Sequence, residues 1–228
     1  VRINPSCVLT FETIAHVAGC TGDWKSALVW DRLALALGAA HERLSPVDLS
    51  NRRRAGPADY AGELALFVSV HLVAACRATG RVDLALETAR RVTLLEESLP
   101  PGRFWAPARP IAGAGQDVAP GADTVAELIG WARILAGRVL LAEGRLEEAR
   151  TQFDALRRYP DRCPDDSMME GVRSTLAFAT LGAAEVLYAK GDDKGARDLL
   201  KLVPHGLLVE LEIERGGIFL IPMPGRAK

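Results

Sequence analysis

Four histidines and four cysteines could hold a metal ion if two pairs of them met. His16 and Cys20 lie four residues apart in a stretch expected to be helical, a spacing that puts two metal ligands on one helix face. His71 and Cys76 are five residues apart and share a face less well. The chain has no second close pair to join His16 and Cys20, and no C-x-x-C. We therefore expect packed helix faces here, with no metal and no other cofactor.

Local catalytic motifs are missing from the sequence. It contains no G-x-S-x-G, P-loop, H-E-x-x-H or dinucleotide fingerprint. Its paired carboxylates, at 96–97, 147–148, 165–166 and 192–193, fall where helix surfaces and turns are expected. A triad assembled from distant residues would leave no such local trace. From the motifs alone we predict that the protein is not an enzyme.

Charge and hydropathy exclude two broad classes of protein. Lys and Arg number 28 against 29 Asp and Glu, so the formal net charge is −1 and no global basic field draws the chain to nucleic acid or to an anionic membrane. The most apolar run, residues 64–76, is shorter than the roughly 18 residues that a membrane span needs, and it contains His71. The run predicts a buried helix, and we expect no membrane span.

A repeated spacing organises the elements that carry these residues. Four times a glycine is followed five residues later by an alanine, between two helix-like stretches: Gly22 and Ala27, Gly80 and Ala85, Gly144 and Ala149, Gly191 and Ala196. A small residue stands seven before each glycine: Ala15, Val73, Gly137 and Ala184. The pattern predicts four pairs of closely packed helices, each joined by a short turn.

Each position in the unit has a physical role. The glycine should take the left-handed conformation that ends the first helix, and Asp23 or Asp192 suits the start of the second. The alanine should lie where the two helices cross. Nine residues after the glycine stand Asp31, Ala89, Phe153 and Leu200. Of these, we expect Phe153 and Leu200 to fill the core of their units.

These units resemble the tetratricopeptide and pentatricopeptide helical repeats. "LLAEGRLEEARTQFDALRRYPD" is similar to the first family, with Gly144, Ala149, Phe153 and Pro160 in its expected order. The opening unit, with Val8, Thr10 and Phe11 before "GDW", is closer to the second. The resemblance implies an all-α, right-handed solenoid of about four helix pairs, spanning residues 1–206.

Insertions and a distinct tail interrupt the regular pattern. The turn glycines are 58, 64 and 47 residues apart, against about 34 for an uninterrupted array, which places loop insertions near 40–60 and 99–123. Such loops are either tolerated insertions or partner contacts, and Phe104 and Trp105 favour contact. In residues 207–228 apolar residues alternate with glutamates, which predicts a β-hairpin or extended arm. Its apolar side chains, expected to bind the solenoid end or another chain, include Val209, Leu211, Ile213 and Phe219.

The fold class and the missing catalytic motifs together favour a protein-binding scaffold or adaptor. The resemblance implies an accessory subunit of a larger complex, such as a mitochondrial ribosome, respiratory complex or ATP synthase, and hence a mitochondrial location, otherwise a cytoplasmic one. The alternative is a pentatricopeptide-type protein that reads single-stranded RNA. Glu12, at the early code position, is an unusual choice beside a polyanion. The basic groups at 52–54, 90–91 and 157–158 are small and separated, so RNA is the less favoured partner.

Overall fold

The chain is all-α over the residues that the computed structural model describes, namely 5–44, 57–99, 104–105, 125–163 and 172–203. This confirms the predicted class. No strand occurs in these ranges. The helices are α1 (Pro5–Cys20), α2 (Trp24–Leu44), α3 (Pro57–Ala78), α4 (Val82–Ser98), α6 (Val125–Ala142), α7 (Leu146–Arg157), α8 (Arg173–Ala189) and α9 (Asp193–Leu200), with a 3-10 turn, η2 (Pro160–Arg162), after α7.

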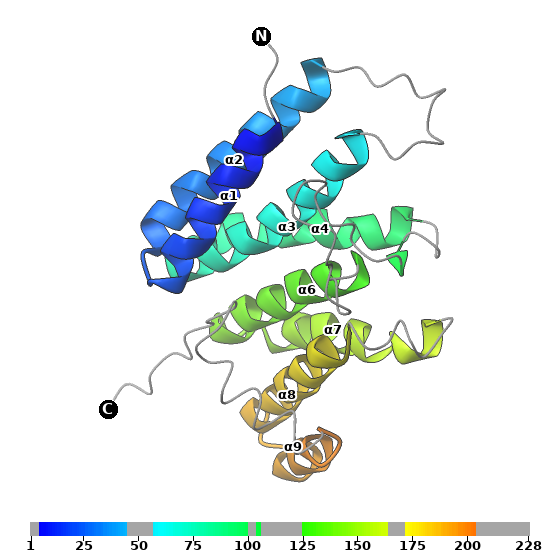
Figure 1. Cartoon of the computed structure of the whole chain (residues 1–228). Helices are drawn as coiled ribbons and strands as arrows, with labels where there is room; N and C mark the ends of the chain where they lie inside the picture. Colours follow the sequence, from blue (N-terminus) through cyan, green and yellow to red (C-terminus); the bar gives the residue numbers. More distant parts are fainter. Residues whose placement is uncertain (1–4, 45–56, 100–103, 106–124, 164–171, 204–228) are drawn as a thin grey trace.

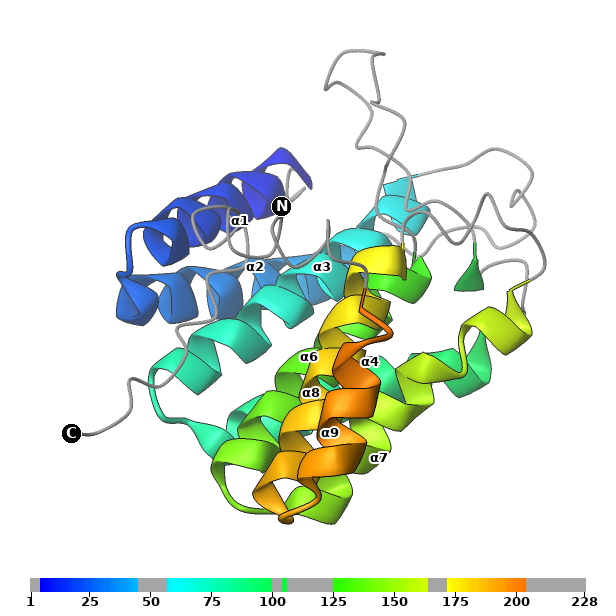
Figure 2. The same ribbon diagram turned by 90° about the horizontal axis from the view of Figure 1, so that it is seen from below.

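The helices form four pairs that stack in chain order. Each helix packs on the next one along the chain, and the first helices of the pairs also contact one another, α1 with α3, α3 with α6 and α6 with α8. Figure 1 shows α1 and α2 at one end of the stack and α9 at the other. Seen from below in Figure 2, α8 and α9 lie in front of α6 and α7. Each pair is therefore covered by its neighbours in sequence.

The turn inside each pair has the conformation that the repeat predicts. Gly22, Gly80, Gly144 and Gly191 have φ of +81°, +72°, +73° and +82°. In this left-handed region a side chain would strain the backbone, which explains why glycine stands at all four turns. The acidic starts are also confirmed in two pairs, because Asp23 accepts from the backbone N–H of Ser26 at 3.1 Å and Asp192 from that of Gly195 at 2.8 Å.

The predicted crossing alanines are all buried: Ala27, Ala85, Ala149 and Ala196. Phe153 is buried as expected, and its ring lies against the backbone of Gly137 and Gly182. The prediction for Leu200 is wrong, because its side chain is 39% exposed. Leu200 lies on α9, the last helix of the described chain, and no further described helix covers it.

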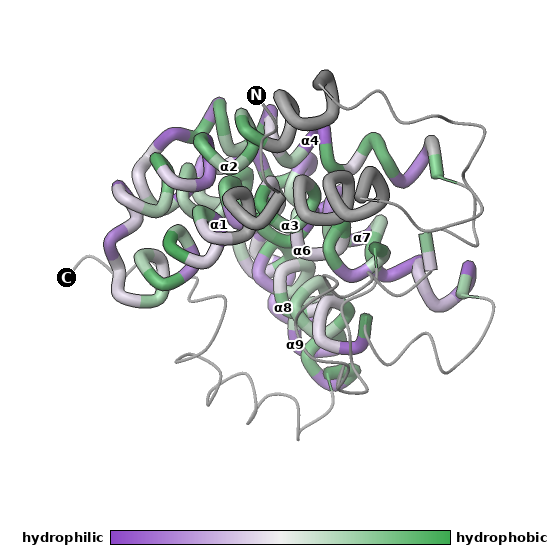
Figure 3. The backbone as a smooth tube through the Cα atoms, turned by 45° about the horizontal axis from the view of Figure 1, so that its top comes forward, coloured by the Kyte–Doolittle hydropathy of each residue, from purple (hydrophilic) through white to green (hydrophobic). Residues whose placement is uncertain are grey.

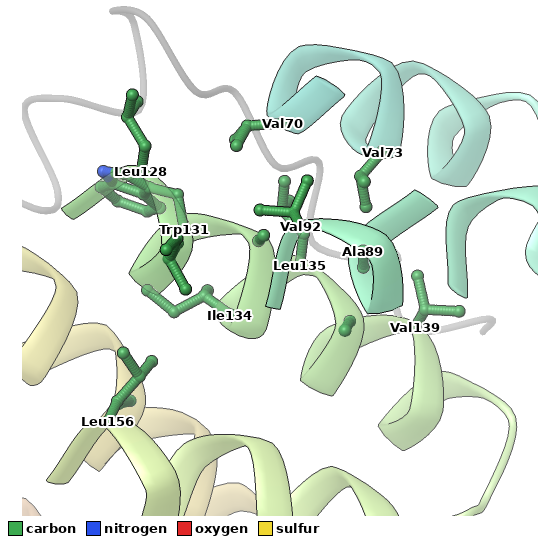
Figure 4. Packing of buried hydrophobic residues seen from close by; sticks show 14 of the residues in the cluster. Val70, Val73, Ala89, Val92, Leu128, Trp131, Ile134, Leu135, Val139 and Leu156 are labelled. Atoms are coloured by element: carbon green, nitrogen blue, oxygen red, sulfur yellow. The ribbon is translucent and has the colours of Figure 1, made fainter. Parts of the chain in front are cut away.

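The core runs through the middle of the stack. Figure 4 shows Val73 of α3, Val92 of α4 and Leu135 of α6 pointing toward one another, with Leu156 of α7 below. Helix α6 is buried on most of its faces, since α3, α4, α7 and α8 all pack on it. In Figure 3 hydrophobic stretches alternate with hydrophilic ones along most helices, as packing on one side requires.

The apolar run at 64–76 lies in α3, and its side chains from Leu66 to Cys76 are mostly buried, so the prediction of a buried helix is confirmed. Among the described helices, none is long and apolar enough to cross a membrane.

Parts of the predicted insertions and the predicted arm lie outside the described residues. Residues 41–44 belong to α2 and residues 57–60 to α3, whereas 45–56 are not described. In the second insertion the structure describes only Leu99 and residues 104–105. All of the arm, with Val209, Leu211, Ile213 and Phe219, is likewise outside. Its strand character and its contacts therefore stay predictions.

Candidate protein-binding surface

Three consecutive first helices present a shared surface. It consists of the residues thirteen, six and three before each turn glycine, which lie on one side of a helix because they are spaced seven and three apart. We call this surface the first-helix face: Phe67, Ala74 and Arg77 of α3, Trp131, Arg138 and Leu141 of α6, and Phe178, Glu185 and Tyr188 of α8. Because α3 contacts α6 and α6 contacts α8, the three rows lie side by side.

One end of the first-helix face is aromatic. The rings of Trp131 and Phe178 meet with their centroids 5.1 Å apart and their planes tilted by 57°. Trp131 is largely buried, whereas Phe67 and Phe178 are partly exposed. Partly exposed aromatic side chains beside a buried one give a partner an apolar surface without unfolding the core. This end therefore leaves part of an aromatic surface exposed.

The other end of the face carries more positive than negative charge. The guanidinium of Arg138 forms an ion pair with the carboxylate of Glu185 across α6 and α8. Arg77 interacts electrostatically with both, but its guanidinium forms no hydrogen bond or ion pair with any described residue. Burial, together with the like charge of Arg138, lowers the pKa of Arg77 to about 10, and Glu185 only partly opposes this. Two guanidinium groups thus share one carboxylate, and the surface favours an added anion.

The structure corrects the prediction that Phe104 and Trp105 contact a partner. Both side chains are only 2% exposed. Their rings pack edge-on against Tyr159, with centroids 5.4 Å and 5.8 Å from its ring. The two aromatic residues therefore fill the core of this chain, and the sequence signal for contact in fact reflected internal packing.

Tyr159 also belongs to a buried polar cluster around Glu96. The Tyr159 hydroxyl donates to the Glu96 carboxylate at 3.1 Å, Arg133 donates at 2.8 Å and Arg162 at 2.5 Å. Burial alone would raise the pKa of Glu96, but Arg133, Arg162 and Tyr159 together lower it below its usual range. Since each group is held by another, the cluster joins α4, α6 and η2 and has a structural role.

A second buried pair joins the first two units. His71 of α3 lies with Nδ1 2.9 Å and 3.0 Å from the two carboxylate oxygens of Asp31 on α2, so Nδ1–H donates to the carboxylate. Burial raises the pKa of Asp31, and the hydrogen bond from His71 partly opposes that rise. Both side chains are almost fully buried. A substrate has no direct access to this pair, so we interpret it as a link between helices rather than as a general base.

Two further titratable residues of α1 lie near this pair. Glu12 is 8% exposed, and burial raises its pKa; the nearby His71 partly opposes that rise, whereas the charge of Asp31 adds to it. Burial also lowers the pKa of His16, whose Nε2 lies 3.6 Å from the sulfur of Cys20. Within the described ranges, no group of three or more His, Cys, Asp or Glu side chains could hold a metal ion.

The sequence contained signals for two features that it was not used to predict, namely the buried pair of Asp31 and His71 and the first-helix face. Asp31 stands nine residues after its turn glycine, the position that Phe153 fills in the third unit. An acid at a core position signals a buried partner, although the sequence does not show which one. An alignment of the units on their turn glycines would have indicated the first-helix face, because it brings together the positions three, six and thirteen before each glycine. The prediction instead considered only the positions that pack inside each pair.

Compared with known proteins, the chain matches no family model, no curated protein and no solved structure. The likeness to helical repeats therefore depends on the residues and geometry of this chain itself.

Proposed function

We propose that this chain is a non-catalytic helical-repeat scaffold, an accessory subunit that binds a protein partner on the first-helix face. The observation that carries the proposal is the position of Arg77. A partly buried guanidinium that shares the charge of Glu185 with Arg138, and forms no hydrogen bond or ion pair with a described residue, lies on the same face as partly exposed aromatic rings. Such a surface needs no reactive group to be useful, because it recognises shape and charge.

The finer fold in this proposal is a right-handed α-solenoid of the tetratricopeptide or pentatricopeptide type, with an extended arm or β-hairpin at 207–228. Three features support the solenoid. The pairs repeat in order, their turn glycines share one conformation, and their first helices contact one another in sequence. In a solenoid the first helices line one continuous surface, which makes the first-helix face a natural binding site.

The partner that fits this face has an acidic group next to a large apolar side chain. A carboxylate would pair with Arg77, whose charge stays unbalanced because Glu185 is already paired with Arg138. An apolar side chain beside it would contact Phe178 at the aromatic end. Charged and aromatic contacts of this kind dominate the energy of many protein interfaces.

RNA binding is less well supported. Glu12, at the code position of the first unit, is buried and cannot read a base from the surface. Two of the basic groups are partly neutralised, since Arg91 pairs with Glu87 and Arg157 with Asp154. The third group, at 52–54, lies outside the described residues.

A larger complex as the setting, and the mitochondrion as the location, are proposed from the resemblance alone, with the cytoplasm as the other location. Fractionation of the cells that naturally express the chain checks the location directly.

Selection of ligands on the purified chain tests the binding site. The full chain is immobilised and exposed to a random displayed peptide library, and Arg77→Glu and Phe178→Ala variants are measured alongside. We expect selected peptides to be rich in Asp or Glu near a large apolar residue. Their affinity should fall by about tenfold or more in either variant, in line with a central interface contact. Arg90→Glu, on the exposed surface of α4, is the matched control and should bind as the natural chain does. Selection of no peptides, or of peptides that bind the Arg77→Glu chain equally well, would contradict the proposal.

A further inference from the structure

The first-helix face has one more positive than negative side chain at its charged end. Arg77 and Arg138 are the two cations, and Glu185, the anion, is already paired with Arg138. Arg77 forms no hydrogen bond or ion pair with a described residue. The charged end and the aromatic end are close, because Glu185 and Phe178 stand seven residues apart on α8, about 10 Å along the helix. A ligand that covers both ends needs an anion and a large apolar group at about this separation.

The predicted arm, residues 207–228, carries these two groups close together in sequence. Glu210, Glu212 and Glu214 alternate with apolar residues and have no cation between them. The residues at 218–221 are Ile, Phe, Leu and Ile. Four residues separate Glu214 from the start of this apolar run, which allows a span of up to about 14 Å. The arm can therefore place a carboxylate at the charged end and a large apolar side chain at the aromatic end.

The arm is also long enough to reach the face. The described chain stops at Val203, directly after α9, and α9 packs on α8. Figure 1 shows α3, α6, α8 and α9 following one another along the stack. Arg77 on α3 is thus three helix spacings from α9, or about 27 Å at 8–10 Å for each. Glu214 stands eleven residues after Val203, an extended reach of about 36 Å.

Other segments outside the described residues fit the face less well. Segment 45–56 has three arginines against one acid, and 106–124 has two aspartates among mostly Ala, Gly and Pro. Segment 164–171 has three acids, but it joins described residues at both ends, so its middle extends at most about 14 Å from them. Val172, where it rejoins the described chain, is thirteen residues from Glu185, about 20 Å along the helix. Among these segments the arm alone combines acidic charge, large apolar residues and sufficient reach.

We propose that residues 210–221 of this same chain bind the first-helix face, with the glutamates at Arg77 and the apolar run at the aromatic end, and compete there with the protein partner. This competition regulates the site of the proposed function and rests on that function. Because the arm is tethered, its local concentration at the face is about millimolar, so even a weak contact competes. A contact that a partner can displace is weak, and the stability of the helix stack does not depend on it.

A zero-length cross-link in the full chain tests the docking without any partner. In an Arg77→Lys chain, carbodiimide joins the new amine to a carboxylate in contact with it, and mass spectrometry of the digest identifies that carboxylate. We expect links from residue 77 to the glutamates at 210–214, about tenfold more abundant than those from residue 90 in an Arg90→Lys control, with a yield that dilution does not change. Links from residue 77 to Glu185 alone, or links only between isotopically light and heavy copies, would overturn the proposal.

Peptide affinity tests the competition. The triple variant Glu210→Gln, Glu212→Gln, Glu214→Gln leaves the described residues unchanged. It should bind an acidic peptide selected on the first-helix face about threefold more tightly than the natural chain, since the face is then free for a larger fraction of the time. Glu97→Gln, on the exposed side of α4, is the matched control and should bind as the natural chain does. Equal affinity of the triple variant and the natural chain would overturn the proposal.

The two measurements separate the docked arm from the proposed function. Links from residue 77 to the arm, with no peptide selected, would contradict the proposed function and leave the arm as the occupant of the face. Selected peptides that depend on Arg77, with no link from residue 77 to the arm, would support the proposed function and overturn the docking.

Discussion

His71 donates from Nδ1 to the carboxylate of Asp31, 2.9 Å from its nearer oxygen, and so joins α3 to α2 inside the stack. Asp31 stands where the third unit has Phe153, which means that a polar pair replaces an apolar contact between two units. A buried pair of this kind contributes specificity as much as stability, because either partner alone is costly to bury.

Removal of one partner should therefore harm the fold more than removal of both. His71→Leu leaves a buried carboxylate and should lower the free energy of unfolding by about 3 kcal/mol. The double variant Asp31→Leu, His71→Leu should lose clearly less, since no polar group is left unpaired. Urea unfolding of the two variants and the natural chain measures this. A double variant that loses as much as His71→Leu, or more, would contradict a paired role.

The pKa of Glu12 gives a pH-dependent prediction. Burial raises this pKa in the folded chain above the unfolded value of 4.5, so ionising Glu12 destabilises the fold as the pH rises through that range. The nearby charges of Asp31 and His71 act on it in opposite directions. Glu12→Gln should consequently be more stable than the natural chain at pH 7, and the difference should vanish as the pH falls toward 4.5.

Chemical unfolding of the natural and Glu12→Gln chains at several pH values checks this prediction. Glu97→Gln, on the exposed side of α4, is the control for the loss of a carboxylate. A Glu12→Gln advantage of equal size at all pH values would show that ionisation of Glu12 does not cause it.

The contact between Gly182 and Phe153 predicts a strong effect of a single methyl group. A Cβ at residue 182 would lie 2.4 Å from the Phe153 ring, which is too close for any real contact. Gly182→Ala should destabilise the chain by about 1–3 kcal/mol, the usual cost of overpacking a core. In a Phe153→Leu background the same change should cost less, because the smaller side chain makes room. Thermal unfolding of the four chains compares the two costs, and equal costs would argue against this contact.

The two arginines of the first-helix face should behave in opposite ways. Arg138→Gln leaves Glu185 without its ion pair and should lower the free energy of unfolding by about 1–3 kcal/mol. Arg77→Gln removes a partly buried charge that lies beside the like charge of Arg138 and forms no ion pair with a described residue, so stability should stay the same or rise. Calorimetry of the purified chains measures both. An equal loss in the two variants would mean that Arg77 has a partner in the free chain.

Features set by one or two neighbouring residues could be predicted from the sequence. The left-handed turn of Gly144 requires only a backbone that other residues avoid, and the burial of Ala149 follows from its distance to that turn. The burial of Phe153 was also predicted correctly. It depends on the unit that follows, which covers the ring. Leu200 occupies the same position, but what covers a residue depends on the next unit, and no described helix follows α9.

Features that join distant residues could not be predicted. Asp31 and His71 are forty residues apart, and their contact depends on how two pairs stack. Trp105 looked like a surface contact because it lies in a Pro- and Gly-rich stretch, whereas its burial against Tyr159 needs the position of η2. Arg77 and Glu185 belong to one site only because α6 brings α3 and α8 together.

The most direct test of the scaffold proposal is photo-crosslinking in the cells that naturally express the chain. A benzophenone side chain replaces Tyr188, which is exposed on the first-helix face, or, as the control, Leu94 on the exposed side of α4. We predict a protein adduct from position 188 that disappears when Arg77→Glu is added, and none from position 94. A nuclease-sensitive adduct from position 188, or no adduct there while position 94 gives one, would contradict the proposal that this face binds a protein partner.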